Sequence, residues 1–202
     1  MSNYDYNVAV LGGGPGGYVA AIRLAQLGKK VAIVEENSLG GICLNWGCIP
    51  TKSLLTNAHV LDIVKNAKKF GINIPSYEVD WSKVIKRSRD VSKRLSKGIE
   101  YLMKKNKITY IPLRGVLENS HTIALSDKKK ITANSIVIAT GASPKKIPIF
   151  KVDAKNIITS SGIKPPNFLK FNEGIWTSTS PNFIFCAIIL SYFNLIYVVE
   201  GG

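Results

Sequence analysis

Residues 7–35 read NVAVLGGGPGGYVAAIRLAQLGKKVAIVE, and this stretch decides the fold. A short apolar run at 7–11 stops at a glycine cluster, and apolar positions then recur at helical spacing as far as Gly28, a residue suited to end a helix. A second apolar run at 31–34 ends at Glu35. Strand, glycine turn, helix and strand in this order form a βαβ unit, whose right-handed crossover makes the two strands parallel.

The glycine cluster fits the pattern G-x-G-x-x-G with Gly12, Gly14 and Gly17. The first glycine permits the tight turn, the second lets a pyrophosphate approach the backbone, and the third lets helix and strand pack closely. Phosphate binds the N–H groups at the start of such a helix, where the dipole favours negative charge. Glu35 is placed to accept hydrogen bonds from a ribose diol. The pattern therefore predicts a dinucleotide site, and by itself it does not separate FAD from NAD.

Periodicity over the rest of the chain indicates a doubly wound α/β fold, Rossmann-like, with a parallel sheet and helices on both faces. Helices are expected at 51–69 and 80–106, the second with Asp80 as its N-cap. An apolar strand at 135–139 is expected to join 7–11 and 31–34 in the parallel sheet. Shorter strand signals lie at 108–111, 116–117 and 122–125.

Two cysteines, Cys43 and Cys48, bracket four residues, and the third, Cys186, lies far away in an apolar region. In a chain without an export signal, such a pair is more often redox-active or metal-binding than structural. A zinc site would need further ligands, and His59 and His121 are the only histidines, so no metal is expected. A neighbouring helix start favours the reactive thiolate. The pair therefore points to redox chemistry.

Taken together, the glycine cluster, Glu35 and residues 40–55 (GGICLNWGCIPTKSLL) resemble the pyridine nucleotide-disulfide oxidoreductases over roughly residues 5–160. Within this family, Leu-Asn-x-Gly-Cys-Ile-Pro-x-Lys favours the branch that oxidises dihydrolipoamide. Glutathione and mercuric reductases usually carry Val-Asn-Val-Gly-Cys-Val-Pro instead. The resemblance implies a reversible disulfide between Cys43 and Cys48, and Cys186 is expected to stay a buried free thiol.

The resemblance also implies a role for each matching position. Cys43 is implied to be the thiol that attacks the substrate, Cys48 the thiol held against the flavin, and Lys52 the lysine beside the isoalloxazine ring. The other implied FAD contacts are Gly12, Gly14, Gly17, Glu35, Gly41, Gly115, Thr140 and Gly141. His59 and His121 lack the His-Pro-Thr context of the family's general base, and neither is assigned a role.

The reaction that the resemblance implies is a relay from a dithiol to a nicotinamide. Dihydrolipoamide would reduce the disulfide through Cys43, electrons would pass from Cys48 to FAD, and NAD would be the final acceptor. The implied partners are the lipoyl domains of 2-oxoacid dehydrogenase complexes, and a second copy of the chain in a homodimer.

Members of this family are more than twice as long as this chain. We expect 1–150 to form an FAD-binding domain with the redox disulfide, and 151–202 to be a linker with the start of a truncated NAD-binding domain. A complete NAD glycine motif, the Gly-Asp segment that holds the ribityl chain and the interface domain are not recognisable in these 202 residues. The chain alone is therefore expected to be inactive. The alternatives are a non-catalytic flavin-binding remnant, or the same half of a glutathione or mercuric reductase.

Composition sets the broad class of the protein. With 46% hydrophobic and 20% charged residues the chain reads as globular. Its net charge of +14 could indicate a nucleic-acid partner. The lysines are dispersed, however, and no aromatic residues interleave with them, so we favour a solvated surface and expect no nucleic-acid partner.

Residues 183–199 carry no charge and read as a marginal membrane span or, as we favour, buried strands. The absence of a targeting signal predicts a cytoplasmic location.

Overall fold

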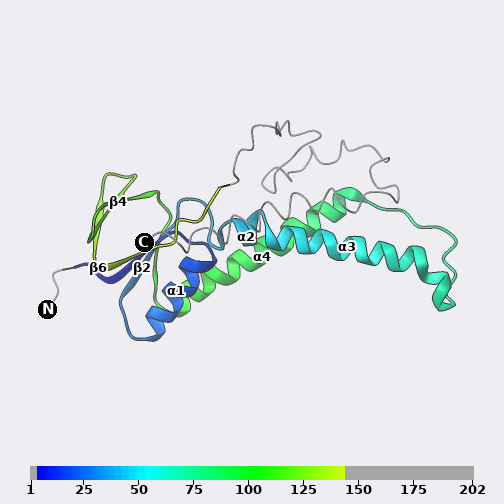
Figure 1. The fold of residues 1–202 in the computed structure, drawn as a ribbon, viewed down its shortest axis with the longest axis horizontal. Coiled ribbons are helices and arrows are strands. Elements are labelled where there is room, and N and C mark those ends of the chain that lie inside the picture. Colours follow the sequence, from blue (N-terminus) through cyan, green and yellow to red (C-terminus); the bar gives the residue numbers. More distant parts are fainter. Residues whose placement is uncertain (1–3, 144–202) are drawn as a thin grey trace, which may run out of the picture. The chain divides into compact units, whose positions relative to one another are not determined.

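The computed structural model describes residues 4–143, which fall into two compact units (Figure 1). The first unit joins the chain up to Asn45 with Lys93–Gly141, and the second contains Trp46–Ser92. Each unit is described by itself below. Predictions outside the described residues are the domain at 151–202, the free thiol of Cys186 and the buried strands within 183–199.

A βαβ arrangement opens the first unit, as the glycine cluster predicted. Strand β1 (Tyr6–Leu11) leads into helix α1 (Pro15–Gln26), which returns the chain to strand β2 (Val31–Val34). The two strands run parallel, with Val8 level with Val31. All of β2 and the last four residues of β1 are buried, because neighbours cover both faces of these strands.

The remaining parallel strands complete the sheet around β1. Strand β6 (Lys130–Ile138) runs parallel to β1 on one side, and β3 (Thr109–Ile111) runs parallel to β2 on the other. The order across the sheet is β3-β2-β1-β6-β5-β4. Strand β1 therefore lies inside the sheet, and the predicted parallel arrangement of 7–11, 31–34 and 135–139 is confirmed.

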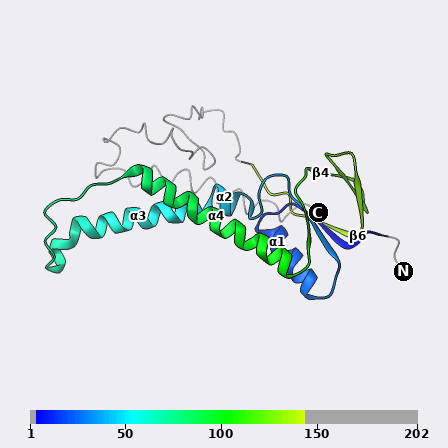
Figure 2. The same ribbon diagram turned by 180° about the vertical axis from the view of Figure 1, so that it is seen from behind.

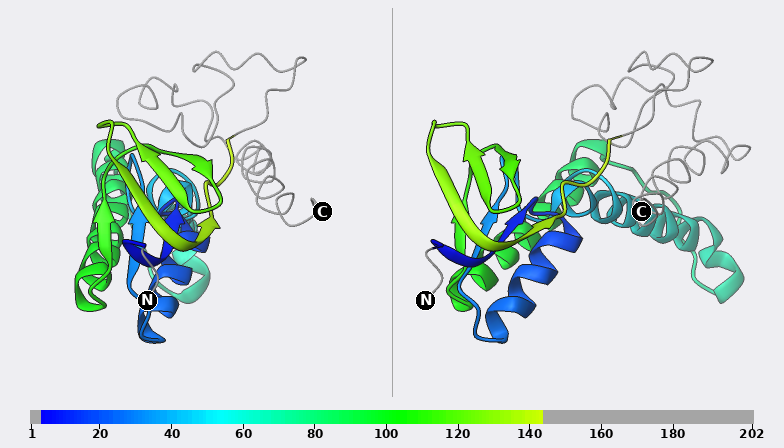
Figure 3. Two further views of the ribbon diagram at one scale, coloured as in Figure 1. Left: turned by 90° about the vertical axis from the view of Figure 1, so that its left-hand side faces the viewer. Right: turned by 60° about the vertical axis from the view of Figure 1, so that its left-hand side comes forward.

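The short strand signals at 116–117 and 122–125 belong to an antiparallel hairpin, whose pairing and position the sequence did not reveal. Strands β4 (Gly115–Asn119) and β5 (Thr122–Leu125) pair with each other, and β5 pairs with the first part of β6. Figure 3 shows the hairpin on the side of β1 opposite to α1. One core cluster joins the hairpin to the parallel strands, and its buried members are Ala9, Leu11, Val34, Ile123, Leu125 and Ala133.

The predicted α/β fold with a largely parallel sheet and helices is confirmed, and the hairpin is an addition to it. The hairpin covers the face of β1 and β2 opposite to α1. Going from β1 to β2 and from β2 to β3, the chain moves in the same direction across the sheet. Because both connections are right-handed crossovers, the helices in them lie on the same face of the sheet. The other face is covered by β5, whose Ile123 and Leu125 point alternate apolar side chains inward.

Two helices form most of the second unit. Helix α3 (Cys48–Asn66) continues as the 3-10 turn η1 (Ala67–Phe70) and ends at Gly71, whose left-handed φ of +79° lets the chain turn away. Helix α4 (Trp81–Lys105) begins after Asp80, whose Oδ1 accepts a hydrogen bond from the Lys83 backbone N–H at 3.1 Å. The predicted N-cap is thus in place.

Helix α4 is a single continuous helix whose last part belongs to the first unit (Figure 2). In the second unit Arg87 Nη1 donates to Ser53 Oγ on α3 at 2.8 Å. In the first unit Ile99 and Met103 of α4 are buried. No helix within residues 4–143 combines the length and the apolar character that crossing a membrane requires.

Candidate functional site

The glycine turn after β1 is packed against backbone on two sides. A Cβ atom on Gly12 would lie 2.1 Å from the carbonyl oxygen of Ala139, just after β6, and the φ of Gly12 is +107°. A Cβ atom on Gly17 would lie 1.9 Å from the carbonyl oxygen of Gly12. No side chain fits at either position without separating the turn from β6 or from α1. The first and third glycines of the pattern therefore serve packing.

The start of α1 has the character of an anion site. Its N-cap is Gly14, which offers no side-chain cap, Pro15 follows, and the first turn contains no acidic residue. The N–H groups of Gly16 and Gly17 lie in the first turn, where a helix provides no internal acceptors. The positive end of the helix dipole and N–H donors without a helical acceptor together favour a phosphate group at this point.

Gly41 lies directly against the second glycine of the pattern. A Cβ atom on Gly41 would be 2.7 Å from Gly14 Cα, and Gly41 has a φ of +56°. The backbone N–H of Gly40 donates to the carbonyl oxygen of Gly13 at 2.8 Å. Two distant stretches of chain, the glycine turn and the start of helix α2 (Gly41–Asn45), are thereby brought together.

The carboxylate of Glu35 bonds to the glycine turn itself. Its Oε2 accepts the backbone N–H of Gly13 at 2.8 Å, and its Oε1 accepts the backbone N–H of Asn37 at 2.8 Å. Each carboxylate oxygen has a second lone pair, so the group retains the capacity to accept a ribose diol. Nearby, burial first and then the charges of Glu35 and Glu100 raise the pKa of Tyr110 above its ordinary value.

The other positions of the first unit that are implied to contact FAD are Gly115, Thr140 and Gly141, and they differ in whether they lie beside the glycine turn. Gly115, the first residue of β4, is packed so tightly that a Cβ would lie 2.8 Å from Leu11 Cδ1. Thr140 follows β6, and its Cα would be 3.0 Å from a Cβ on Gly12. Gly141 comes next, exposed, with φ +76°. The structure thus brings Thr140 to the glycine turn, while Gly115 is half-buried against side chains of the core.

A disulfide joins Cys43 of α2 to Cys48, the first residue of α3. Both cysteines are partly exposed. Cys48 lies in the first turn of α3, where the helix dipole stabilises negative charge on a released sulfur. Within residues 4–143 no three His, Cys, Asp or Glu side chains gather into a metal site.

Lys52 and the histidines complete the residues singled out from the sequence. Lys52 is exposed on α3 in the second unit, one helical turn beyond Cys48. His59 is exposed on the same helix. His121 lies in the turn between β4 and β5, where Nδ1 is 3.1 Å from the carbonyl oxygen of Ala133 and the ring stacks on Tyr4 at 4.9 Å. These contacts give His121 a structural position.

Sequence reasoning gave no role to Asn45, which lies between the two cysteines. Its amide makes hydrogen bonds to Leu39, Gly41 and Ser96. The signals in the sequence were the place of Asn45 inside the cysteine loop and in the Leu-Asn-x-Gly-Cys pattern, and neither indicates the partner on α4, which is 51 residues away. That pairing could not be read from the chain.

The described residues fit the adenosine and pyrophosphate end of FAD. The start of α1 is uncapped by any side chain, the Gly16 position is open because a Cβ there would meet nothing within 4 Å, and Glu35 is an acceptor at the adjoining strand end. An anion-binding helix start, a backbone open to close approach and a diol acceptor are the donor and acceptor set of a dinucleotide site.

The parallel sheet, the glycine turn and the disulfide-bonded cysteines occur together in one chain. The chain belongs to the pyridine nucleotide-disulphide oxidoreductase family, whose family model matches residues 6–170.

Among individual proteins, the chain is similar to several dihydrolipoyl dehydrogenases. The chain is 45% identical over 163 residues to a dihydrolipoyl dehydrogenase of Chlorobaculum parvum, an alignment covering 79% of this chain and 35% of the relative. It is 46% identical over 166 residues to that of Zymomonas mobilis, covering 80% and 36%. A mitochondrial dihydrolipoyl dehydrogenase of Schizosaccharomyces pombe is 44% identical over 167 residues, covering 79% and 33%. The chain thus spans about a third of the length of these relatives.

Proposed function

We propose that the chain is the FAD-binding, disulfide-carrying part of an enzyme that oxidises dihydrolipoamide. The observation that carries the proposal is the disulfide of Cys43 and Cys48 on a loop fastened to the glycine turn through Gly41 and Gly14. The similarity to dihydrolipoyl dehydrogenases supports the choice of substrate.

The chemistry assigned to the two cysteines is thiol–disulfide exchange. A thiolate of dihydrolipoamide attacks Cys43 Sγ, forming a mixed disulfide and releasing Cys48 as a thiolate. The second thiol of the substrate gives up its proton and attacks its own mixed-disulfide sulfur, which releases lipoamide and Cys43 as a thiolate. Two electrons have then moved from the substrate to the protein. The start of α3 stabilises the negative charge left on Cys48.

FAD, when bound, supplies an acceptor for this electron pair and a donor for NAD. The residues assigned to hold it are the first turn of α1 for pyrophosphate, Glu35 for the ribose, and Thr140 and Gly141 beside the turn. Lys52 is assigned to the isoalloxazine end, one turn from Cys48 on α3.

The remaining parts of the proposal follow from family membership. NAD is proposed as the final acceptor, lipoyl domains of 2-oxoacid dehydrogenase complexes as partners, and a homodimer as the assembly. Residues 1–150 are proposed as the FAD-binding domain and 151–202 as a linker with the start of the NAD-binding domain. A cytoplasmic location is proposed, although one of the similar proteins carries the name of a mitochondrial form.

A non-catalytic flavin-binding protein is the second candidate. The observation that favours it is that the start of α1 and Glu35 fit a dinucleotide without taking part in disulfide exchange. The two candidates differ in whether Cys43 and Cys48 exchange with a dithiol.

The experiment mixes the purified chain with dihydrolipoamide or, at matched thiol concentration, glutathione. Alkylation and peptide mass spectrometry then measure the reduced fraction of the Cys43–Cys48 pair, with and without added FAD. We expect faster reduction by the dithiol, and quenching of FAD fluorescence on titration with the chain. A disulfide that resists dihydrolipoamide while FAD still binds would favour the non-catalytic candidate. Faster reduction by glutathione would favour a glutathione reductase.

A further inference from the structure

Both the nitrogen and the oxygen of the Asn45 side-chain amide make hydrogen bonds. Its Nδ2 donates to the carbonyl oxygens of Leu39 at 3.2 Å and Gly41 at 3.0 Å. Its Oδ1 accepts a hydrogen bond from Ser96 Oγ on α4 at 2.9 Å. All of these groups belong to the first unit and are partly buried, where lost hydrogen bonds are not simply replaced by water.

Each anchor is itself held by rigid structure. The Leu39–Gly41 segment is bonded to the glycine turn through Gly40 N–H and the Gly13 carbonyl oxygen at 2.8 Å. Ser96 precedes Ile99 by one helical turn, and Ile99 is only 8% exposed. The loop between the cysteines is therefore clamped between the turn after β1 and a helix that is anchored in the core.

We propose that Asn45 and Ser96 are positioning residues that set the equilibrium of the Cys43–Cys48 disulfide. When the disulfide is reduced, its covalent ring is open, and the hydrogen bonds of Asn45 hold the loop in the closed conformation. A loop kept in that conformation presents one sulfur to the other at a higher effective concentration. Because disulfide and hydrogen bonds favour the same loop conformation, each strengthens the other by the same factor.

This inference rests on the reversible exchange in the proposed function, but its test needs no flavin, NAD or dihydrolipoamide. The whole chain is equilibrated with mixtures of reduced and oxidised dithiothreitol. One dithiothreitol gives two electrons and two protons to the disulfide and closes its own ring, and the protein gains two thiols. Alkylation and peptide mass spectrometry report the reduced fraction of Cys43 and Cys48.

Removing the amide lowers the equilibrium constant for forming the disulfide. For Asn45→Ala we expect about a three- to tenfold decrease, and tenfold corresponds to a potential about 30 mV less negative for a two-electron couple. Ser96→Ala removes the hydrogen bond to Asn45 Oδ1 and leaves those to Leu39 and Gly41, and we expect a decrease of about two- to threefold, since a single net hydrogen bond is modest. Ser96→Thr keeps the hydroxyl and restores the original value.

The control is Ser82→Ala, the same chemical change at an exposed position of α4. A purely structural role for Asn45 would lower the stability of oxidised and reduced chain equally and leave the dithiothreitol equilibrium unmoved. Thermal unfolding of the oxidised and the reduced form of each variant is therefore measured together with the dithiothreitol equilibrium. If Asn45→Ala does not fold, the proposal is tested by comparing the dithiothreitol equilibrium of Ser96→Ala with that of Ser96→Thr.

Unchanged equilibria in the folded variants would overturn the proposal. A wild-type disulfide that dithiothreitol cannot reduce reversibly would instead contradict the proposed function, so the two failures are distinguishable.

Discussion

Glu35 and Gly13, 22 residues apart, are joined by a 2.8 Å hydrogen bond from the backbone N–H of Gly13 to Glu35 Oε2. The acidic residue that follows β2 therefore holds the glycine turn through its own carboxylate. We therefore expect Glu35 both to hold the glycine turn and to accept hydrogen bonds from a ribose diol. Because of these two roles, substitutions of Glu35 are expected to affect stability as well as cofactor binding.

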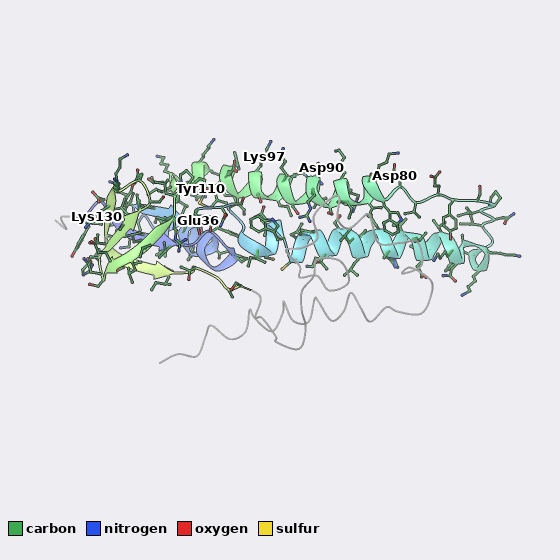
Figure 4. The ribbon with its side chains drawn as sticks, turned by 90° about the horizontal axis from the view of Figure 1, so that it is seen from above. Glu36, Asp80, Asp90, Lys97, Tyr110 and Lys130 are labelled. Atoms are coloured by element: carbon green, nitrogen blue, oxygen red, sulfur yellow. The ribbon has the colours of Figure 1, made fainter. Side chains whose placement is uncertain are left out.

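We predict that Glu35→Ala lowers both the free energy of unfolding and the affinity for FAD. Hydrogen bonds to charged groups contribute about 1.5 to 3 kcal/mol, and the stability loss is expected in that range. Urea unfolding and FAD fluorescence titration measure the two effects. Glu36→Ala is the matched control, since Glu36 is the exposed neighbour labelled in Figure 4. Equal effects of the two substitutions would show that the bond to Gly13 contributes nothing.

Gly17→Ala is predicted to destabilise the first unit strongly. The added methyl would lie 1.9 Å from the Gly12 carbonyl oxygen, which is backbone and cannot rotate away. Overpacking of this kind costs about 1 to 3 kcal/mol and occasionally more.

The matched control for that substitution is Gly16→Ala, one residue earlier on α1. A Cβ there meets nothing within 4 Å, so the variant is expected to gain about 0.5 to 1 kcal/mol from helix propensity. Both are measured by urea unfolding. A Gly17→Ala variant as stable as Gly16→Ala would mean that the turn and α1 are not packed as described.

Asp5 is predicted to contribute to the loss of stability in acid. Its Oδ2 accepts the backbone N–H and the hydroxyl of Thr132, and these hydrogen bonds lower the pKa of Asp5 below its ordinary value. A carboxyl with a lowered folded-state pKa contributes stability above the unfolded-state pKa and loses it as the pH falls through the folded-state pKa.

Asp5→Asn should therefore be less stable than the original chain near neutral pH, and the gap should close below about pH 4, the ordinary range of an aspartate. Because Asp5 is exposed, the effect is expected to be small. Unfolding midpoints against pH measure it, and a gap that widens in acid would contradict the assignment. Thr132→Val removes the hydroxyl, which donates to Asp5 Oδ2 and accepts the Asp5 backbone N–H, but keeps the backbone N–H of residue 132 that donates to Oδ2. It should therefore give an intermediate curve.

The 202 residues alone are predicted to retain FAD weakly and not to reduce NAD with dihydrolipoamide. They align with only about a third of each relative, and His59 and His121 lack the sequence context of the family's base. Losing general base assistance alone removes a factor of about 10² to 10⁴ in rate. Adding a polypeptide with the rest of a relative is the informative control. Rates for the isolated chain near those of full-length relatives would refute this prediction.

The local features of the fold could be predicted from the sequence. Parallel β1 and β2, the helix between them and the N-cap Asp80 depend on periodicity, glycine and capping residues within a few positions of one another. The pairing of Cys43 with Cys48 was implied by the family resemblance of an equally short stretch, residues 40–55. Such features are encoded locally, because backbone geometry and side-chain spacing within one turn decide them.

The sequence could not reveal what depends on pairs far apart in the chain. The short strand signals at 116–117 and 122–125 did not indicate that these strands would pair and fold over β1 and β2, because that depends on which apolar surface best covers the second face. Asn45 meets Ser96 only because α4 returns beside the cysteine loop. The sequence by itself determined the βαβ unit and the redox pair, and only the tertiary structure decided what covers the sheet and what holds the loop, since long-range contacts exist only after the chain has folded.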